Sequence, residues 1–191
     1  WKGYEVIKFI APSSKEYAGT GKARFLYRGE AYYFDDFHNV FPKGSRVKMP
    51  QAFPRKGQTF FYNALLSVGN LVIVVDDATA AFSSTLSDGE RALLATSKHH
   101  SIDVFLLAHT PRLFPPSAIP FLTGMRLFLT KSLPPKDRLD QLPNAEEYPI
   151  AFEELKQLPQ YSYFTFDFNA DKVYRYTHGQ GTELLPNDYF L

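Results

Sequence analysis

Cysteine is absent from this chain, and several other features that would narrow its function are missing too. Without cysteine there is no disulfide, no zinc–thiolate site and no thiol nucleophile, a composition that suits a reducing compartment. No apolar run approaches the roughly 20 residues of a membrane span, and no signal peptide is visible. The formal net charge is only +1. The field of the whole chain therefore favours no partner, and any nucleic-acid surface must be a local patch.

The composition is that of a folded protein. Apolar residues make up 45% of the chain and charged residues 21%, which is ample for a hydrophobic core and too little charge for a disordered chain. The 18 Phe and 12 Tyr fall mostly in strand-like patterns, which favours sheet packing. With no repeat and no low-complexity linker, we expect one domain over residues 1–191, with a loose tail at 177–191.

The hydrophobic periodicity predicts strand, helix, strand, helix, strand through the middle of the chain. The expected strands are 4–11, 22–27, 30–34, 71–75, 102–108, 125–130, 161–168 and 172–176, and the expected helices are 59–68, 87–98, 136–142 and 145–158. The basic segment 35–57 is predicted to be loop with a short helical turn. Arg28-Gly29 indicates a turn between two strands, Gly69 a helix end, and Ser87 with Glu90 a capping box at a helix start. This order indicates an α/β fold with parallel strands, right-handed crossovers and a β-rich C-terminal part.

The run Leu71–Asp77 carries the first candidate chemistry. Five consecutive apolar residues predict a strand buried on both faces of a parallel sheet, and ligands bind at the carboxyl ends of such strands. Asp76 and Asp77 stand at that end, where one acid would hold Mg²⁺ through water and the other would orient the attacking water. The alternative is that one acid caps the next helix and the other is a solvated loop residue.

His109 and Thr110 end the next expected strand and are the second candidate. A polar side chain there would contact the γ-phosphate of a nucleotide; the alternative is a turn before Pro111. Because both strands end in polar groups at the same edge, the two candidates support each other. Arg112, with Arg91 and Arg126 as alternatives, would stabilise phosphate charge, or would be an ordinary surface cation.

Three further motifs carry less weight. Gly19–Lys22 looks like the end of a phosphate loop, but Glu16 and Ala23 break the pattern and a strand follows where a helix is required. His99-His100 lacks metal-ligand spacing, and we interpret it as a solvated helix end. The basic side chains between Lys43 and Lys56 would contact phosphates or simply be solvated.

Taken together, these segments resemble the additional-strand P-loop ATPases of the FtsK–HerA type, which include viral genome-packaging ATPases and zonular-occludens-toxin-like assembly ATPases. Leu71–Asp77 resembles Walker B, Ser101–Pro111 resembles the sensor strand, and Thr123–Leu129 resembles the next core strand. The resemblance covers roughly residues 4–176, as a pattern of elements and not as a strict signature.

The resemblance implies a P-loop NTPase-like, mostly parallel sheet, ATP and Mg²⁺ as cofactors, and a ring of identical subunits that moves nucleic acid, with DNA as the expected polymer. It implies the cytoplasm as location, or the host cytoplasm or virion for a viral protein. In its terms Asp76 binds the metal shell, Asp77 positions water, and His109 or Thr110 senses the γ-phosphate. Arg112 is the candidate arginine.

The chain departs from the family pattern at two points. The usual Asp-Glu pair is Asp76-Asp77 here, and the shorter acid stands about one methylene further from the water. No Walker A motif precedes the strand at 4–11, so we expect either an N-terminal piece before Trp1 or a degenerate ATPase. The rival hypothesis is therefore a non-enzymatic structural or interaction domain, and a weaker third is a different α/β hydrolase whose acids bind metal directly.

Overall fold

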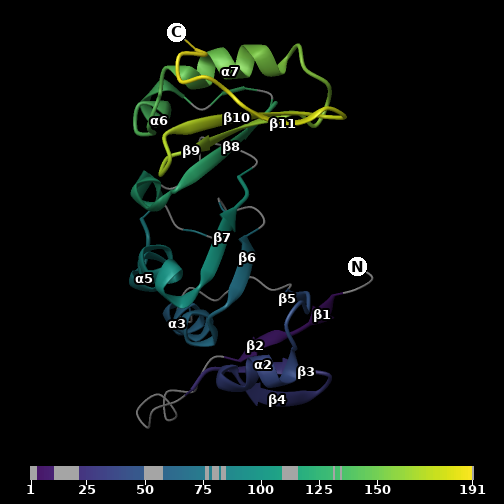
Figure 1. Ribbon diagram of the computed structural model, residues 1–191. Coiled ribbons are helices and arrows are strands. Elements are labelled where there is room, and N and C mark those ends of the chain that lie inside the picture. The colour runs from purple at the N-terminus through teal and green to yellow at the C-terminus, as the bar shows by residue number, and fades with distance from the viewer. Residues whose placement is uncertain are drawn as a thin grey trace. The chain divides into compact units, whose positions relative to one another are not determined.

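The computed structural model describes residues 4–10, 22–49, 58–75, 78, 82, 85–108, 116–130, 132–133 and 135–190. The chain divides into two compact units, Trp1–Ala108 and His109–Leu191, whose elements are labelled in Figure 1. Parallel strands flanked by helices are followed by an antiparallel C-terminal sheet, which confirms the predicted α/β class. The prediction of a single domain stays a prediction. Within the described ranges, no helix is both long and apolar enough to cross a membrane.

Two small sheets begin the first unit. The antiparallel sheet contains β2 (Lys8–Ile10), β3 (Arg24–Tyr27) and β4 (Glu30–Tyr33), and the parallel pair contains β1 (Glu5–Val6) and β5 (Val47–Lys48). Arg28 (φ 51°) and Gly29 (φ 90°) form the predicted turn between β3 and β4, because such a two-residue turn needs positive φ at both positions. Lys22 contacts Asp35 and precedes a strand, which agrees with rejecting the phosphate-loop interpretation; Gly19–Gly21 lie outside the described residues.

The segment 35–57, expected to be loop with a short helical turn, contains that turn and also a strand. It contains β5, the end of the short helix η1 (Phe34–Asp36), and α2 (Phe37–Val40). The reason is pairing and packing: Glu5 N–H and Ile7 N–H donate to Arg46 O and Lys48 O at 2.8 and 3.0 Å, which makes a strand of a segment whose sequence has no strand pattern.

An aromatic cluster around Phe25 fills the core of these sheets. Phe25 has no exposed surface, and its ring centroid lies 5.2 Å from that of Phe34 and 5.7 Å from those of Phe37 and Phe41. Tyr32 stacks on it at 5.6 Å. Aromatic pairs at these separations contribute beyond the area that they bury, so this cluster holds β3, β4 and α2 together.

The second half of the first unit is the predicted strand–helix–strand segment. Its elements are α3 (Gln58–Val68), β6 (Leu71–Val75), α5 (Asp88–Thr96), η3 (Ser97–His100) and β7 (Ile102–Leu106). Strands β6 and β7 are parallel, with Leu71 opposite Ile102 and Val75 opposite Leu106. Gly69 (φ 61°) ends α3 as predicted, and Asn70 N–H donates to His100 O at 2.9 Å. The two connections therefore meet at the amino ends of the strands.

The predicted burial of the Leu71–Val75 strand on both faces is wrong for one face. Leu71, Ile73 and Val75 are half-buried, whereas Val72 and Val74 are 67% and 59% exposed. Phe105, opposite Val74, is exposed as well. The apolar run predicts a strand that can be buried on both faces. It does not predict whether another element packs on each of them.

Helix α5 starts with the capping box that its sequence predicts. Glu90 Oε2 accepts from Ser87 N–H at 2.6 Å, and Ser87 Oγ accepts from Glu90 N–H at 3.4 Å. Glu90 is fully buried. The burial of the neighbouring Tyr62 raises the pKa of the Tyr62 hydroxyl, and the charge of Glu90 raises it further. The helix start is thus both hydrogen-bonded and enclosed, which places α5 firmly against α3.

Gly89 permits this close approach. A Cβ added at residue 89 would lie 2.7 Å from Thr59 Cα and 3.2 Å from Tyr62 Cδ2. We expect Gly89→Ala to lower the free energy of unfolding by about 1–3 kcal/mol, because a backbone contact that short outweighs a gain of up to ~1 kcal/mol in helix propensity. Urea denaturation measures the effect. Ala95→Ser, which adds one atom on the exposed side of α5, is the control; equal stability of both variants would contradict the described packing.

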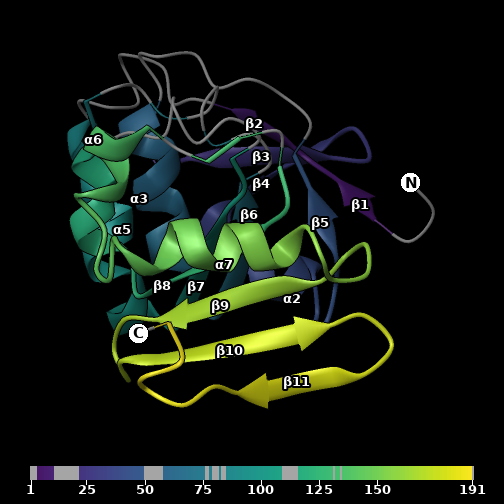
Figure 2. The same cartoon turned by 90° about the horizontal axis from the view of Figure 1, so that it is seen from above.

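The second unit is an antiparallel sheet with helices. Its elements are η5 (Pro116–Phe121), β8 (Gly124–Phe128), α6 (Lys136–Leu139), α7 (Glu147–Leu155), β9 (Tyr163–Asp167), β10 (Lys172–Thr177) and β11 (Gly181–Leu184). The strand order is β11-β10-β9-β8, and α7 lies along one face of the sheet (Figure 2). The core contains Tyr148, Phe152, Phe164 and Phe166.

The structure differs from two expectations in this unit. The strand expected to continue the parallel sheet, β8, pairs antiparallel with β9; its alternation of buried Leu127 with exposed Arg126 and Phe128 suits a sheet covered on one face. In place of a loose tail at 177–191, β11 pairs with β10 and Leu185 is buried. Arg175 ties this segment down by donating to Glu183 and Tyr189 at 2.6 Å each and by contacting Glu154.

Candidate functional site at the carboxyl ends of β6 and β7

Backbone hydrogen bonds hold the carboxyl ends of β6 and β7 side by side. Leu107 N–H donates to Val75 O at 3.0 Å, and Ala78 N–H donates to Leu107 O at 2.7 Å. Ala78 is fully buried and its carbonyl accepts from Phe82 N–H at 3.0 Å. The chain that leaves β6 is therefore anchored to the chain that leaves β7 immediately beyond the strands.

All five predicted site residues fall in the two segments that leave these strands. Asp76 and Asp77 stand between Val75 and Ala78 in the sequence, and His109, Thr110 and Arg112 follow Ala108. These five residues lie outside the described residues. The structure shows the strands that precede them: Val75 ends β6 immediately before the first segment, and Ala108, the last residue before the second, lies two residues beyond the end of β7.

The other predicted cations fall within the described residues. Arg91 is exposed on the first turn of α5. Arg126 lies in β8, with its guanidinium carbon 5.3 Å from the centroid of the Tyr163 ring. His99 and His100 end η3, and no group of three or more His, Asp or Glu in the described ranges is arranged to hold a metal ion. Arg112 thus remains the candidate arginine nearest in sequence to the paired strand ends.

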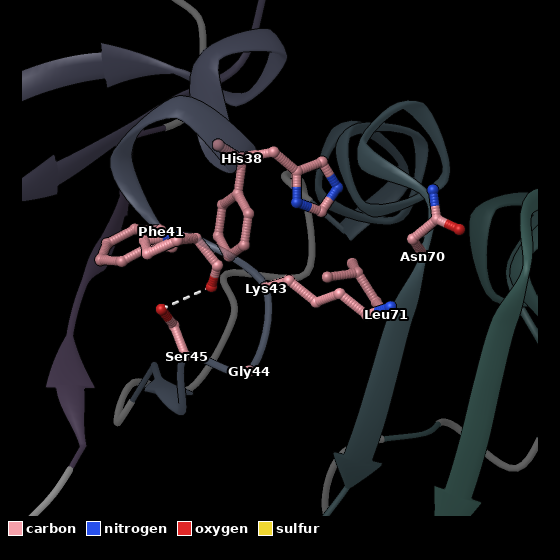
Figure 3. Close-up of a pocket in the computed structure, with 9 residues that line it drawn as sticks. His38, Phe41, Lys43, Gly44, Ser45, Asn70 and Leu71 are labelled. Carbon is pink, nitrogen blue, oxygen red and sulfur yellow. Dashed lines mark hydrogen bonds between the residues drawn. The ribbon is translucent and has the colours of Figure 1, made fainter.

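A pocket of about 380 Å³ opens at the opposite, amino end of β6. It is lined by Phe37, His38, Phe41, Pro42, Lys43, Gly44, Ser45, Asn70 and Leu71. Figure 3 shows these residues arriving from α2 and the following turn on one side and from the start of β6 on the other. Its place excludes it as the pocket of the predicted chemistry, since a strand of five residues separates it from Asp76.

His38 has a structural role there that the sequence did not indicate. Its Nε2 lies 3.1 Å from both Val68 O and Gly69 O. Two carbonyl acceptors require that Nε2 carries the proton and donates. His38 thus satisfies carbonyls at the C-terminus of α3, where helices leave them without partners. A lone histidine in a basic segment carries no sequence signal for this contact.

Comparisons with known proteins place the fold. No protein-family model matches the chain, and no curated protein matches it. The genome-packaging NTPase B204 of Sulfolobus turreted icosahedral virus 2 in complex with AMP superposes with a TM-score of 0.58 at 15% identity, over 75% of this chain and 70% of that one. Its complex with AMPPCP gives 0.55 at 17% identity, over 74% and 69%.

The DNA-packaging ATPase B204 of Sulfolobus turreted icosahedral virus superposes with a TM-score of 0.57 at 16% identity, over 90% of this chain and 80% of that one. At such identities the likeness is one of fold. The order of elements, the parallel pair β6–β7 and the three superpositions agree, and the resemblance inferred from the sequence is thereby confirmed: this chain is similar in fold to the P-loop ATPases of the FtsK–HerA type.

Proposed function

We propose that the chain is the main body of an ATP-driven motor that translocates or packages nucleic acid and works as a ring of identical subunits. The observation that carries the proposal is the pair of parallel strands whose carboxyl ends are hydrogen-bonded together and are followed in the sequence by Asp76-Asp77 and His109-Thr110. The likeness to packaging ATPases of two viruses supports it, and a viral origin would place it in the host cytoplasm or the virion.

The donor set suits Mg²⁺ and a nucleotide. Magnesium takes one or two carboxylates and otherwise waters and phosphate oxygens, and Asp76 would supply the carboxylate at the end of β6. Bound Mg²⁺ would neutralise charge on the phosphates. Asp77 would orient a water molecule and accept its proton. His109 or Thr110 would hydrogen-bond the γ-phosphate oxygens, and Arg112 would stabilise their charge, in its own site or in that of a neighbouring subunit.

The metal role of Asp76 gives a direct test. In the full gene product, Asp76→Asn removes one negative charge from the metal shell. We expect the Mg²⁺ concentration for half-maximal ATP turnover to rise about 10–100-fold, the range for outer-shell partners of bound metals. A magnesium titration of ATP turnover measures it. Asp103→Asn, an exposed carboxylate on β7, is the control and should leave the titration unchanged.

The same measurement separates the alternatives. A gene product that binds neither ATP nor Mg²⁺ would contradict the motor and leave the non-enzymatic interaction domain. Metal binding without nucleotide binding would instead favour an α/β hydrolase whose acids hold the metal directly.

A further inference from the structure

The sheet of the C-terminal unit has two chemically different faces. Leu127, Phe164 and Phe166 point into the core beside α7. Alternation along the strands places another set on the opposite side, and we name this side the outer face. Its residues are Arg126, Phe128, Tyr163, Thr165, Asp167, Lys172, Tyr174, Tyr176, Thr182 and Leu184. Phe128 and Leu184 are 45% and 53% exposed, so large apolar groups meet solvent at both margins of this face.

Three aromatic rings form a row across the outer face. Phe128, Tyr163 and Tyr176 are direct cross-strand neighbours on β8, β9 and β10. The Tyr163 ring centroid lies 5.0 Å from that of Phe128 and 4.8 Å from that of Tyr176. Tyr163 is enclosed between the other two rings, so the free ring surface of the row is at its ends. Phe128 lies on the edge strand β8, and its ring is the most exposed of the three.

Hydrogen-bond donors and two cations share the outer face with this row: Arg126 lies over the Tyr163 ring, and Lys172 is four residues from Tyr176 along β10. Within the described part of the chain, the hydroxyl groups of Tyr163, Tyr174 and Tyr176 have no hydrogen-bond partner, and Arg126 and Lys172 have no carboxylate partner. Asp167 is the one carboxylate of the face; it lies directly opposite Lys172, and its Oδ1 accepts from Asn169 and Ala170 N–H at 3.0 Å each. With two cations, one acid and unpaired donors, the face carries a net positive charge, which favours a polyanion.

We propose that the outer face binds single-stranded DNA. Two cations release few counterions, since each neutralised phosphate contributes only about 0.7 to the salt slope on a single strand. The remaining affinity must come from bases that stack on aromatic rings, and this requires unpaired bases that can reach an exposed ring. Bases inside a duplex are stacked on one another and cannot reach Phe128. The combination of an exposed ring row with two cations therefore selects the single strand over the duplex.

The inference rests on the proposed function and deepens it by naming how the moved polymer is held, and it takes its choice of DNA from the likeness in fold to a DNA-packaging ATPase. Binding at the outer face requires no nucleotide. Its success and that of the motor proposal can therefore be measured separately.

The test is fluorescence anisotropy with a labelled oligothymidylate of about 15 nucleotides, bound to the full gene product without ATP. Arg126→Gln with Lys172→Gln should make the slope of log affinity against log salt shallower by about 1.4. Phe128→Ala should weaken binding about tenfold with an unchanged slope. Lys156→Gln is the matched control: Lys156 also lies over an aromatic ring, that of Phe152, but at the C-cap of α7, and its loss should change neither quantity.

Four results would overturn the inference: no binding by the parent chain, an unchanged slope in the double variant, a duplex bound as tightly as the single strand, or RNA bound more tightly than DNA. The double variant changes exposed side chains, and its unfolding midpoint should match that of the parent. Oligonucleotide binding without ATP turnover would contradict the motor proposal but not this inference. ATP turnover without oligonucleotide binding would contradict this inference but not the motor proposal.

Discussion

Replacing Asp77 with Asn in the full gene product is expected to lower ATP turnover by at least about 100-fold, the lower bound for loss of a general base, while ATP binding is retained. The amide has nearly the shape of the carboxylate but cannot accept the water's proton. The substitution therefore removes a proton acceptor and little volume. Steady-state turnover and nucleotide affinity, measured on the same preparation, separate the chemical step from binding.

The control for this experiment is again Asp103→Asn, since it removes the same charge from the same pair of strands. Asp103 lies opposite Val72, toward the amino end of β7 and away from the segment that contains Asp77. Parent-like turnover in Asp77→Asn would remove Asp77 from the mechanism. Equal losses in both variants would indicate a general effect of charge on the sheet and not a local role.

Phe25→Ala is expected to cost about 3–5 kcal/mol of the free energy of unfolding, the range for a fully buried phenylalanine. The ring of Phe25 contacts four other rings from β4, η1, α2 and the residue after α2. Its removal therefore leaves a cavity that no single neighbour can fill. Because two compact units need not unfold together, hydrogen exchange of the β3–β4 segment is the informative measurement.

Tyr33→Ala serves as the matched control, because Tyr33 is an aromatic residue of the neighbouring strand with 48% of its surface exposed. Its loss should change the exchange of this segment by no more than about 0.5 kcal/mol. Comparable losses in the two variants would mean that the Phe25 cluster is not the core of these strands.

Local elements were predictable wherever two separate sequence signals indicate the same element. Helix α5 has both an apolar period and the Ser87–Glu90 capping box, and it begins at Asp88 as predicted. The β3–β4 turn has two alternating segments and an Arg28-Gly29 pair at the right place. The parallel pairing of β6 with β7 follows from an apolar run on each side of a helix.

The pairing partners of the strands, and the elements that cover each face of a sheet, were predictable only in part, because they depend on residues far away in the sequence. β8 was expected beside the parallel strands, and its choice of β9 rests on the fit of Met125 and Leu127 to Phe166 and Phe164. An apolar run such as that of β6 does not state which face is covered. The contact of His38 with the end of α3 depends on a fold that brings residues 30 positions apart together.

For the site, the sequence supplies the identities of the residues and the structure supplies their support. Asp76, Asp77, His109 and Thr110 were chosen because they follow two apolar strands, and those strands are paired and parallel as required. The roles of the side chains rest on chemistry that the experiments on Asp76 and Asp77 address.

The hydrogen bond from Asn70 N–H to His100 O has a mechanical consequence. It joins the connection that enters β6 to the connection that enters β7. A Cβ at the adjacent Gly69 would lie 3.0 Å from the same carbonyl, and its φ of 61° disfavours any side chain there. The two strands are thus joined at their amino ends as well as at their carboxyl ends, where Leu107 N–H donates to Val75 O. A displacement of α3 would therefore move both strands together as one unit, and the two segments that follow them would shift by the same amount.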